Sequence, residues 1–153
     1  MERSSTCLRA TIRECNQASK LPYRKNGGSG GSDQSGANGL LCKIFLLSGY
    51  EIGFTTSDNP YFPVDGAKLS YFEAGTGSSA LNKRIAYLNG SAALWWLRSP
   101  NTNNTNNVWN VNSNGNYNNN NASNSNGIRP ALMESEISNP SDGTNTVHHH
   151  QRE

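Results

Sequence analysis

The side chains that could carry out catalysis are sparse in this sequence. A cysteine nucleophile needs a nearby base, yet the only histidines form the run 148–150 near the end. A hydrolase that works through two facing carboxylates needs acidic residues close together, and none occurs between Glu73 and Glu134. The residue types therefore favour a protein that is not an enzyme.

Cysteine and histidine also give no reason to expect a cofactor or a metal site. The cysteines form neither a CxxC pair nor a Cys/His metal spacing, and they are Cys7, Cys15 and Cys42. Free thiols or small buried apolar residues are the simplest interpretation, and a Cys7–Cys15 bridge stays open. The histidine run could bind a metal weakly, but it fits a disordered tail better.

Asparagine dominates the polar chemistry that remains. Residues 101–126, NTNNTNNVWNVNSNGNYNNNNASNSN, contain 15 asparagines among 26 residues and no charge. Without context, such a segment is typical of disordered or aggregation-prone chain. However, Trp109, Val111 and Tyr117 recur at odd positions between asparagines at even ones, which is the period-2 pattern of a half-buried strand. This pattern predicts a hairpin.

The turn of this hairpin decides which face each side chain takes. A two-residue Asn-Gly loop would put Tyr117 opposite Asn112, on the wrong face. A three-residue loop of residues 113–115, with Gly115 in a left-handed conformation, puts Tyr117 opposite Val111. We expect the second arrangement, because it gathers the asparagines on the face away from the apolar residues.

Other elements must position the hairpin. The run LLCKIFLL, residues 40–47, has strand length, and SGYE, residues 48–51, fits the S-x-x-E capping box that begins a helical turn. A short helix is expected around 67–72. The run ALWWLRSP predicts a further strand, in which Trp95 and Trp96 point to opposite faces.

Composition divides the chain into three parts. Residues 1–39 lack periodicity and end in a Gly/Ser-rich stretch, so we expect an N-terminal arm and linker. Residues 40–133 form the domain, and GIRPALM at its end predicts a last strand that Pro130 confines to an edge or a bulge. Residues 134–153 form a polar tail.

Charge and hydropathy argue against several kinds of partner. The net charge is +2 and the 13 lysines and arginines are scattered, so there is no basic stripe to follow a nucleic acid. No apolar run reaches the roughly 18 residues that a membrane span needs, so membrane insertion is not expected. The charged first residues precede no continuous apolar stretch, so no signal peptide is visible.

Five landmarks resemble a known family. KIFLLS, AKLSYF, RIAYLNGSA, WWLRSP and GIRPAL follow one another within about residues 40–133. They resemble the C-type-lectin-like domains of gut bacterial and phage proteins, many known only as a domain of unknown function and distantly related to the formylglycine-generating-enzyme fold. The resemblance implies an α+β fold of small antiparallel sheets with one or two short helices and much loop. Formylglycine-generating relatives use paired cysteines in the C-terminal part, and no cysteine follows Cys42 here, so that activity is not implied.

Some members resemble the variable proteins of diversity-generating retroelements, in which an error-prone reverse transcriptase alters a template only at adenines. Asparagine is encoded by AAC or AAT, so changes at the adenines yield many side chains and never a stop codon. The resemblance implies that residues 101–126 are the variable region and that Asn114 is a turn residue. The candidate ligand-binding residues are Asn103, Asn104, Asn106, Asn107, Asn110, Asn112, Asn116, Asn118, Asn119, Asn120, Asn121, Asn124 and Asn126.

The resemblance also implies a scaffold, a partner and a location. The scaffold residues would be Trp95, Trp96, Arg98, Trp109, Val111, Tyr117 and Arg129. The implied function is non-enzymatic binding of a protein or glycan at a cell surface, by an extracellular, surface or phage-tail protein, and homo-oligomers would strengthen weak sites through avidity.

Two alternatives remain beside this implied function. The first is calcium-independent glycan binding through Asn amides and Trp109. Calcium-dependent sugar binding is not expected, because the asparagine face has no carboxylate. The other alternative is a structural or assembly module of an adhesin or virion, with a fixed Asn-rich hairpin.

Overall fold

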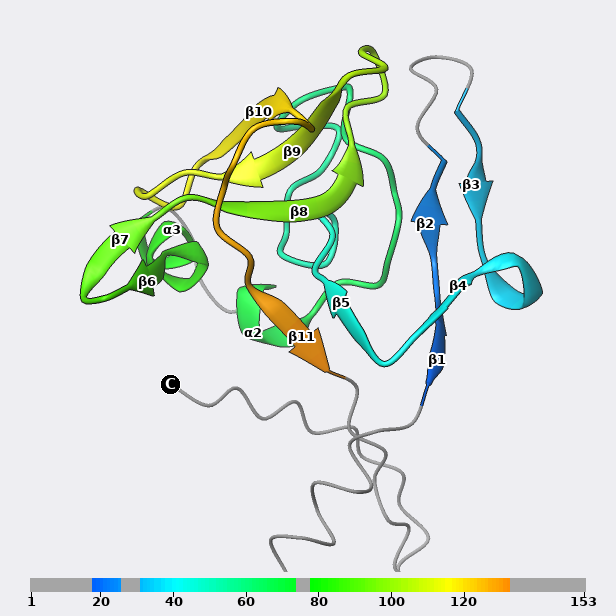
Figure 1. The fold of residues 1–153 in the computed structure, drawn as a ribbon, viewed down its shortest axis with the longest axis horizontal. Helices are drawn as coiled ribbons and strands as arrows, with labels where there is room; N and C mark the ends of the chain where they lie inside the picture. The colour runs from blue at the N-terminus through cyan, green and yellow to red at the C-terminus, as the bar shows by residue number, and fades with distance from the viewer. Residues whose placement is uncertain (1–17, 26–30, 74–77, 133–153) are drawn as a thin grey trace, which may run out of the picture.

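Small antiparallel sheets dominate the structure, which is a computed structural model that describes residues 18–25, 31–73 and 78–132 (Figure 1). The largest sheet has the strand order β10-β9-β8, and these strands are Tyr117–Asn121, Asn107–Val111 and Trp95–Pro100. The two short α-helices of the described residues are α2, Ser70–Glu73, and α3, Ser78–Arg84. The expectation of small antiparallel sheets with one or two short helices and much loop is confirmed.

Four two-stranded pairs complete the described part of the fold. β1 pairs with β4, β2 with β3, β5 with β11, and β6 with β7. Their bounds are Ser19–Leu21 for β1, Tyr23–Arg24 for β2, Asp33–Gln34 for β3, Leu40–Cys42 for β4, Ile44–Leu46 for β5, Ala86–Leu88 for β6, Ser91–Ala93 for β7 and Pro130–Leu132 for β11. A 3-10 turn, η2, spans Gly36–Asn38.

The segment expected to be an arm and linker is part of the fold where it is described. β1 pairs with β4, and Leu21, which lies opposite Leu40, is buried. The carbonyl of Pro22 accepts a hydrogen bond from Arg98 Nε at 3.2 Å. These pairings are long-range, and short runs such as SKL give no periodic signal, so the sequence did not indicate them. Residues 1–17 and the expected tail lie outside the described residues.

The predicted capping box is confirmed. Ser48 N–H donates to Glu51 Oε2 at 2.9 Å, and Glu51 N–H donates to Ser48 Oγ at 3.0 Å. The turn that it begins leads into the core at Ile52. The helix expected around 67–72 begins later, as α2, because Leu69 N–H is hydrogen-bonded to the Glu51 carbonyl at 3.0 Å.

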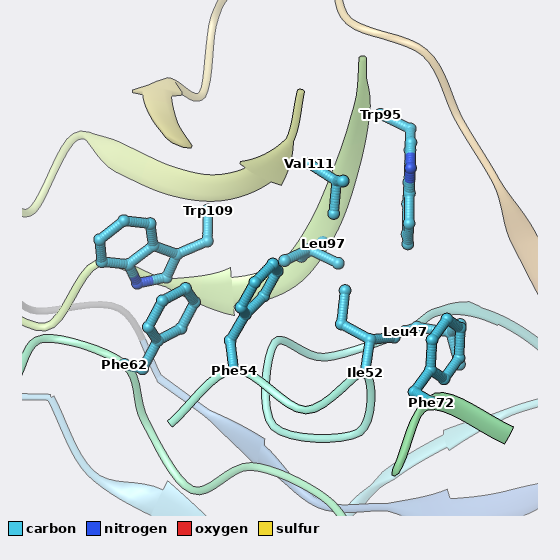
Figure 2. Packing of buried hydrophobic residues seen from close by; sticks show 9 residues of the cluster. All are labelled: Leu47, Ile52, Phe54, Phe62, Phe72, Trp95, Leu97, Trp109 and Val111. Atoms are coloured by element: carbon cyan, nitrogen blue, oxygen red, sulfur yellow. The ribbon is translucent and has the colours of Figure 1, made fainter. Parts of the chain in front are cut away.

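Aromatic and aliphatic side chains from loops, from α2 and from the three-stranded sheet form the core, as Figure 2 shows. The buried cluster comprises Leu47, Ile52, Phe54, Phe62, Phe72, Trp95, Leu97, Trp109 and Val111. Phe62 stacks on Trp109 with ring centroids 4.2 Å apart. Trp96 is next to Trp95 on the strand and is also buried, although it is outside this cluster. Both faces of β8 are therefore covered.

Candidate ligand-binding site

The Asn-rich hairpin has the predicted register. Tyr117 lies opposite Val111, and Asn112 N–H donates to the Asn116 carbonyl at 2.7 Å across a loop of residues 113–115. Gly115 has a φ of 83°, in the left-handed region that glycine tolerates. A Cβ at this position would also overlap the backbone carbonyl of Leu81 on α3. Gly115 therefore sets the register and lets the turn lie against the helix.

The expected separation of apolar and polar faces holds for only part of the hairpin. Trp109, Val111 and Tyr117 share the core-facing side, and Asn110 and Asn118 share the other. Asn119 and Asn121 lie two and four residues after Tyr117, so their side chains are on the same side of the strand as Tyr117. Asparagines therefore also occupy the core-facing side of the hairpin, toward the end where the core stops.

One pair of asparagines on the core-facing side bond to each other. Asn107 Nδ2 donates to Asn119 Oδ1 at 2.6 Å. Both of these candidate residues are half-buried, and each has one amide atom engaged within the protein. They are less available to a ligand than an exposed asparagine would be.

Two loops of the Asn-rich segment meet at one end of the hairpin. We call residues 101–106 and 121–126 the paired loops. Ala122 N–H donates to the Asn106 carbonyl at 2.9 Å, and Asn101 N–H donates to the Asn107 carbonyl at 3.0 Å. Main-chain hydrogen bonds therefore hold both loops to each other and to the strands.

A third loop anchors the first of the paired loops through the carbonyl of Tyr61. This oxygen accepts from Thr102 N–H at 3.1 Å, from Thr102 Oγ1 at 3.1 Å and from Trp109 Nε1 at 3.2 Å. Tyr61 is 40 % exposed. Trp109 is only 1 % exposed, so the stacking of a sugar on Trp109, left open from the sequence, is excluded in this structure.

Tyr61 is therefore a surface aromatic beside the paired loops that the sequence did not single out. It lies in the turn-rich stretch around Pro60 and Pro63, where no periodicity separates inward from outward residues. Its neighbour Val64 is also exposed. The long-range contact of Tyr61 with residue 102 is a property of the fold and not of the local sequence.

Several asparagine side chains stabilise the turns of these loops through hydrogen bonds to the backbone. The side-chain oxygens of Asn101, Asn104, Asn114 and Asn121 each accept from the N–H two residues ahead, at 2.8 to 3.1 Å. These are Asx turns, which asparagine and aspartate favour because their short side chain mimics the backbone. Asn104 and Asn121, both candidate binding residues, therefore have a structural use, and Asn114 is the expected turn residue.

Exposure divides the candidate residues into three groups. The exposed ones are Asn103, Asn104, Asn106, Asn116, Asn118, Asn121 and Asn124. The half-buried ones are Asn107, Asn112, Asn119, Asn120 and Asn126. The remaining candidate is Asn110, which is 0 % exposed. Most exposed candidates belong to the paired loops, so these loops, with Tyr61 beside them, are the candidate site.

Asn110 lies inside the protein and not on a binding surface. It sits in the middle strand opposite Trp96, and segment 126–127 runs along the far side of β8, where Trp96 N–H donates to the Gly127 carbonyl at 2.9 Å. Neither its Oδ1 nor its Nδ2 has a hydrogen-bond partner among the described residues. The structure removes Asn110 from the set of residues that a ligand could touch.

The scaffold arginine Arg98 joins four segments of the chain. Its guanidinium donates to both oxygens of Glu51, at 2.5 and 2.6 Å, and to the carbonyls of Leu46 and Asp65, at 2.9 and 2.6 Å. The side chains of Arg98 and Glu51 are 9 % and 8 % exposed. A bidentate, buried pair of this kind fixes β8 relative to the capping box.

Next to this ion pair, Asp65 is buried beside Ser99. Ser99 Oγ lies 3.0 and 2.8 Å from the two Asp65 oxygens and accepts from Gly49 N–H at 2.8 Å. Burial raises the pKa of Asp65 to about 6, although Ser99 and Arg98 oppose the shift. Arg98 and Ser99 of WWLRSP therefore belong to a buried polar network. The first of the paired loops begins directly after this motif.

Arg129, Trp95 and Tyr117, which were also expected to be scaffold residues, make contacts that join different segments of the fold. The Arg129 guanidinium lies 5.0 Å from the centre of the Trp95 ring, and burial lowers the pKa of Arg129. Trp95 Nε1 donates to the Arg84 carbonyl at 2.9 Å. Tyr117 OH donates to the Asp58 carbonyl at 2.7 Å, which ties the hairpin to the loop that carries Tyr61.

Two features are absent from the described residues. Within residues 18–25, 31–73 and 78–132, no group of three or more His, Cys, Asp and Glu side chains could hold a metal ion. No helix in the same ranges is long and apolar enough to cross a membrane.

Comparison with known proteins gives one match. No curated protein and no solved structure matches the chain significantly. Residues 4–133 match the family described as a domain of unknown function, DUF6273. The matched range includes the strands before residue 40, the buried Arg98 network and the whole Asn-rich hairpin. The chain therefore belongs to the DUF6273 family.

Proposed function

We propose that this protein is a non-enzymatic ligand-binding protein of C-type-lectin-like fold, and that its Asn-rich segment is the variable region of a diversity-generating retroelement. The ligand is a protein or glycan on a cell surface, and the protein acts outside the cell, at a surface or on a phage tail. The paired loops and Tyr61 form the binding face.

One observation carries this proposal. The loops that hold most of the exposed asparagines are fixed by main-chain hydrogen bonds, from Ala122 to Asn106 and from Thr102 to Tyr61. Main-chain bonds do not depend on the side chain at a position, so exposed residues such as Asn103 and Asn124 could change while the loops keep their shape. A face of this kind suits repeated substitution.

The chemistry of the face suits binding of an uncharged or hydrogen-bonding surface. Residues 101–126 carry no charge, and exposed amides offer both donors and acceptors. Antibody paratopes combine such adaptable polar groups with rigid aromatic anchors. Here Tyr61 is the exposed aromatic residue beside the loops, so we expect weak binding by this copy and stronger binding by variants that add Tyr or Trp.

A fixed structural or assembly module is the second candidate function, and the Asx turns favour it. Asn101, Asn104, Asn114 and Asn121 use their own side-chain chemistry to shape the loops. If most asparagines were present for this reason, the segment would be constant in sequence and would mediate assembly.

Sequencing of the gene and its flanking DNA across the source population separates the two. The binding proposal expects substitutions confined to adenines of the Asn codons, with a near-identical repeat and a reverse-transcriptase gene nearby. The four Asx-turn positions should keep Asn, Asp, Ser or Gly, all reachable from AAC or AAT, whereas Asn103, Asn106 and Asn124 should vary freely. A constant segment without a repeat would refute the proposal and leave the assembly module.

A binding assay tests the same face on the protein. A display library diversified at exposed positions such as Asn103, Asn106 and Asn124 should yield binders to cell-surface proteins or glycans. A matched library at the buried positions Asn101 and Asn110 should yield few binders, because side chains at these positions do not reach the surface. Equal recovery of binders from both libraries would contradict the assignment of the face.

A further inference from the structure

The two-stranded sheet β5–β11 carries apolar side chains on both of its faces. Along residues 128–132 exposure alternates, with Ile128, Pro130 and Leu132 exposed and the two residues between them half-buried. Ala131 and its partner Phe45 pack against the core. A strand with one face in water normally carries polar residues there, so the outer face of this sheet has the composition of a covered face.

The neighbouring strand and a nearby hairpin extend this surface. Ile44 is paired with Leu132 and is 63 % exposed. Tyr87 and Leu88, 69 % and 63 % exposed, line one open pocket of about 190 Å³ together with Ile128 and Pro130. We call this continuous surface the apolar patch, and its members are Ile44, Tyr87, Leu88, Ile128, Pro130 and Leu132.

The apolar patch is large for a monomer and close to what a dimer uses. Its six side chains expose on the order of 600 Å², the upper end of the largest patches on monomeric proteins. A standard interface buries about 800 Å² on each partner. A polar rim of ordinary width would bring the patch to that size.

Charge and strand pairing favour a second copy of this chain as the occupant. Strands β5 and β11 contain no charged residue, and the Arg129 guanidinium between two patch residues lies over the Trp95 ring. An apolar, uncharged surface is complementary to itself, as an interface with two-fold symmetry requires. Among the described residues β11 pairs only with β5, so its outer edge is also open to a neighbouring strand.

We propose that the apolar patch packs against the same patch of a second copy, which gives a two-fold symmetric dimer. The outer faces of the two β5–β11 sheets lie against each other, and the open pocket accepts an apolar side chain of the other copy. In Figure 1 these strands lie at the end of the fold away from the loop that joins β8 and β9. The dimer therefore leaves the paired loops free, whatever they bind.

Sedimentation equilibrium on the full chain, over about 1 to 200 µM, tests this proposal. We expect the average mass to rise with concentration from 16.6 kDa toward twice that value. The double variant Ile128→Asp, Leu132→Asp places charges at two exposed patch positions and should weaken dimerisation by about 100-fold or more. The control variant Val64→Asp changes a similarly exposed residue outside the patch, at 57 % exposure, and should keep the dimer.

Hydrogen exchange distinguishes the other occupants. The dimer predicts that peptides covering 127–132 gain protection as concentration rises, and that the double variant loses this gain while still unfolding cooperatively. A chain that stays monomeric overturns the proposal: concentration-independent protection would assign the patch to another segment of the same chain, and lack of protection to a different protein. A dimer unaffected by the double variant would also overturn it.

Discussion

The buried carboxyl of Asp65 should make the protein less stable as pH rises through the weakly acidic range. Its pKa is about 6 in the folded protein against 3.8 for the free group. The folded state therefore binds more protons than the unfolded state between these values, and stability is lost as pH increases. At about 1.4 kcal/mol for each pKa unit, the loss is about 3 kcal/mol. It is complete above about pH 6.

The substitution Asp65→Asn should remove this loss. An asparagine has nearly the same shape, stays uncharged, and can still donate to or accept from Ser99 Oγ, 2.8 Å from the present carboxylate. Urea unfolding of both proteins between about pH 3.5 and pH 7.5 measures the difference in free energy of unfolding. Relative to the unmodified protein, the variant should gain about 3 kcal/mol across this range, mostly between the two pKa values.

Comparison of the two proteins isolates Asp65 together with its electrostatic coupling to Glu51 and Arg98, because the titrating groups farther away contribute equally to both curves. A carbon NMR titration of the Asp65 carboxyl provides an independent check and should show a midpoint near 6. A difference curve that is flat would mean that burial costs the ionised form nothing. A curve of opposite slope would mean that Arg98 stabilises the carboxylate more than burial disfavours it, and either result refutes the reasoning.

Two further substitutions test the hairpin. Asn110→Val should raise the free energy of unfolding by about 1 to 3 kcal/mol, because it removes two buried amide atoms without partners among the described residues; a loss of stability in urea unfolding would show that the amide is satisfied in solution. Gly115→Ala should cost at least about 2 kcal/mol, because it combines left-handed strain with overlap of the Leu81 carbonyl. Gly90→Ala, with φ 79° and open space around it, is the matched control and should cost only the strain, about 1 to 2 kcal/mol. Equal losses at the two glycines would contradict the packing of the turn on α3.

Local patterns predicted the parts of the fold that depend on neighbours in the chain. The capping box of Ser48 and Glu51 and the three-residue turn at Gly115 follow from backbone geometry over a few residues, and both are confirmed. The Asx turns are equally local, and the oxygen of an asparagine two residues before a free N–H is their signal. They were missed because repetition of asparagine hides which copies make turns.

Long-range contacts limited the prediction of the site. Asn110 follows the alternation of an outward-facing residue, but it is buried in the middle strand and has no exposed surface. Tyr61 joins the candidate site only through hydrogen bonds to residues about 40 or more positions away. Neither fact is encoded in periodicity or composition near the residue itself.

The three hydrogen bonds at position 61 have a consequence for how the family could change over time. Their acceptor is a main-chain oxygen, which every amino acid provides. The side chain at position 61 could thus be replaced without release of Thr102 or the Trp109 ring nitrogen. Position 61 lies outside the Asn-rich segment 101–126, so a substitution there would alter the surface beside the paired loops without altering the segment itself.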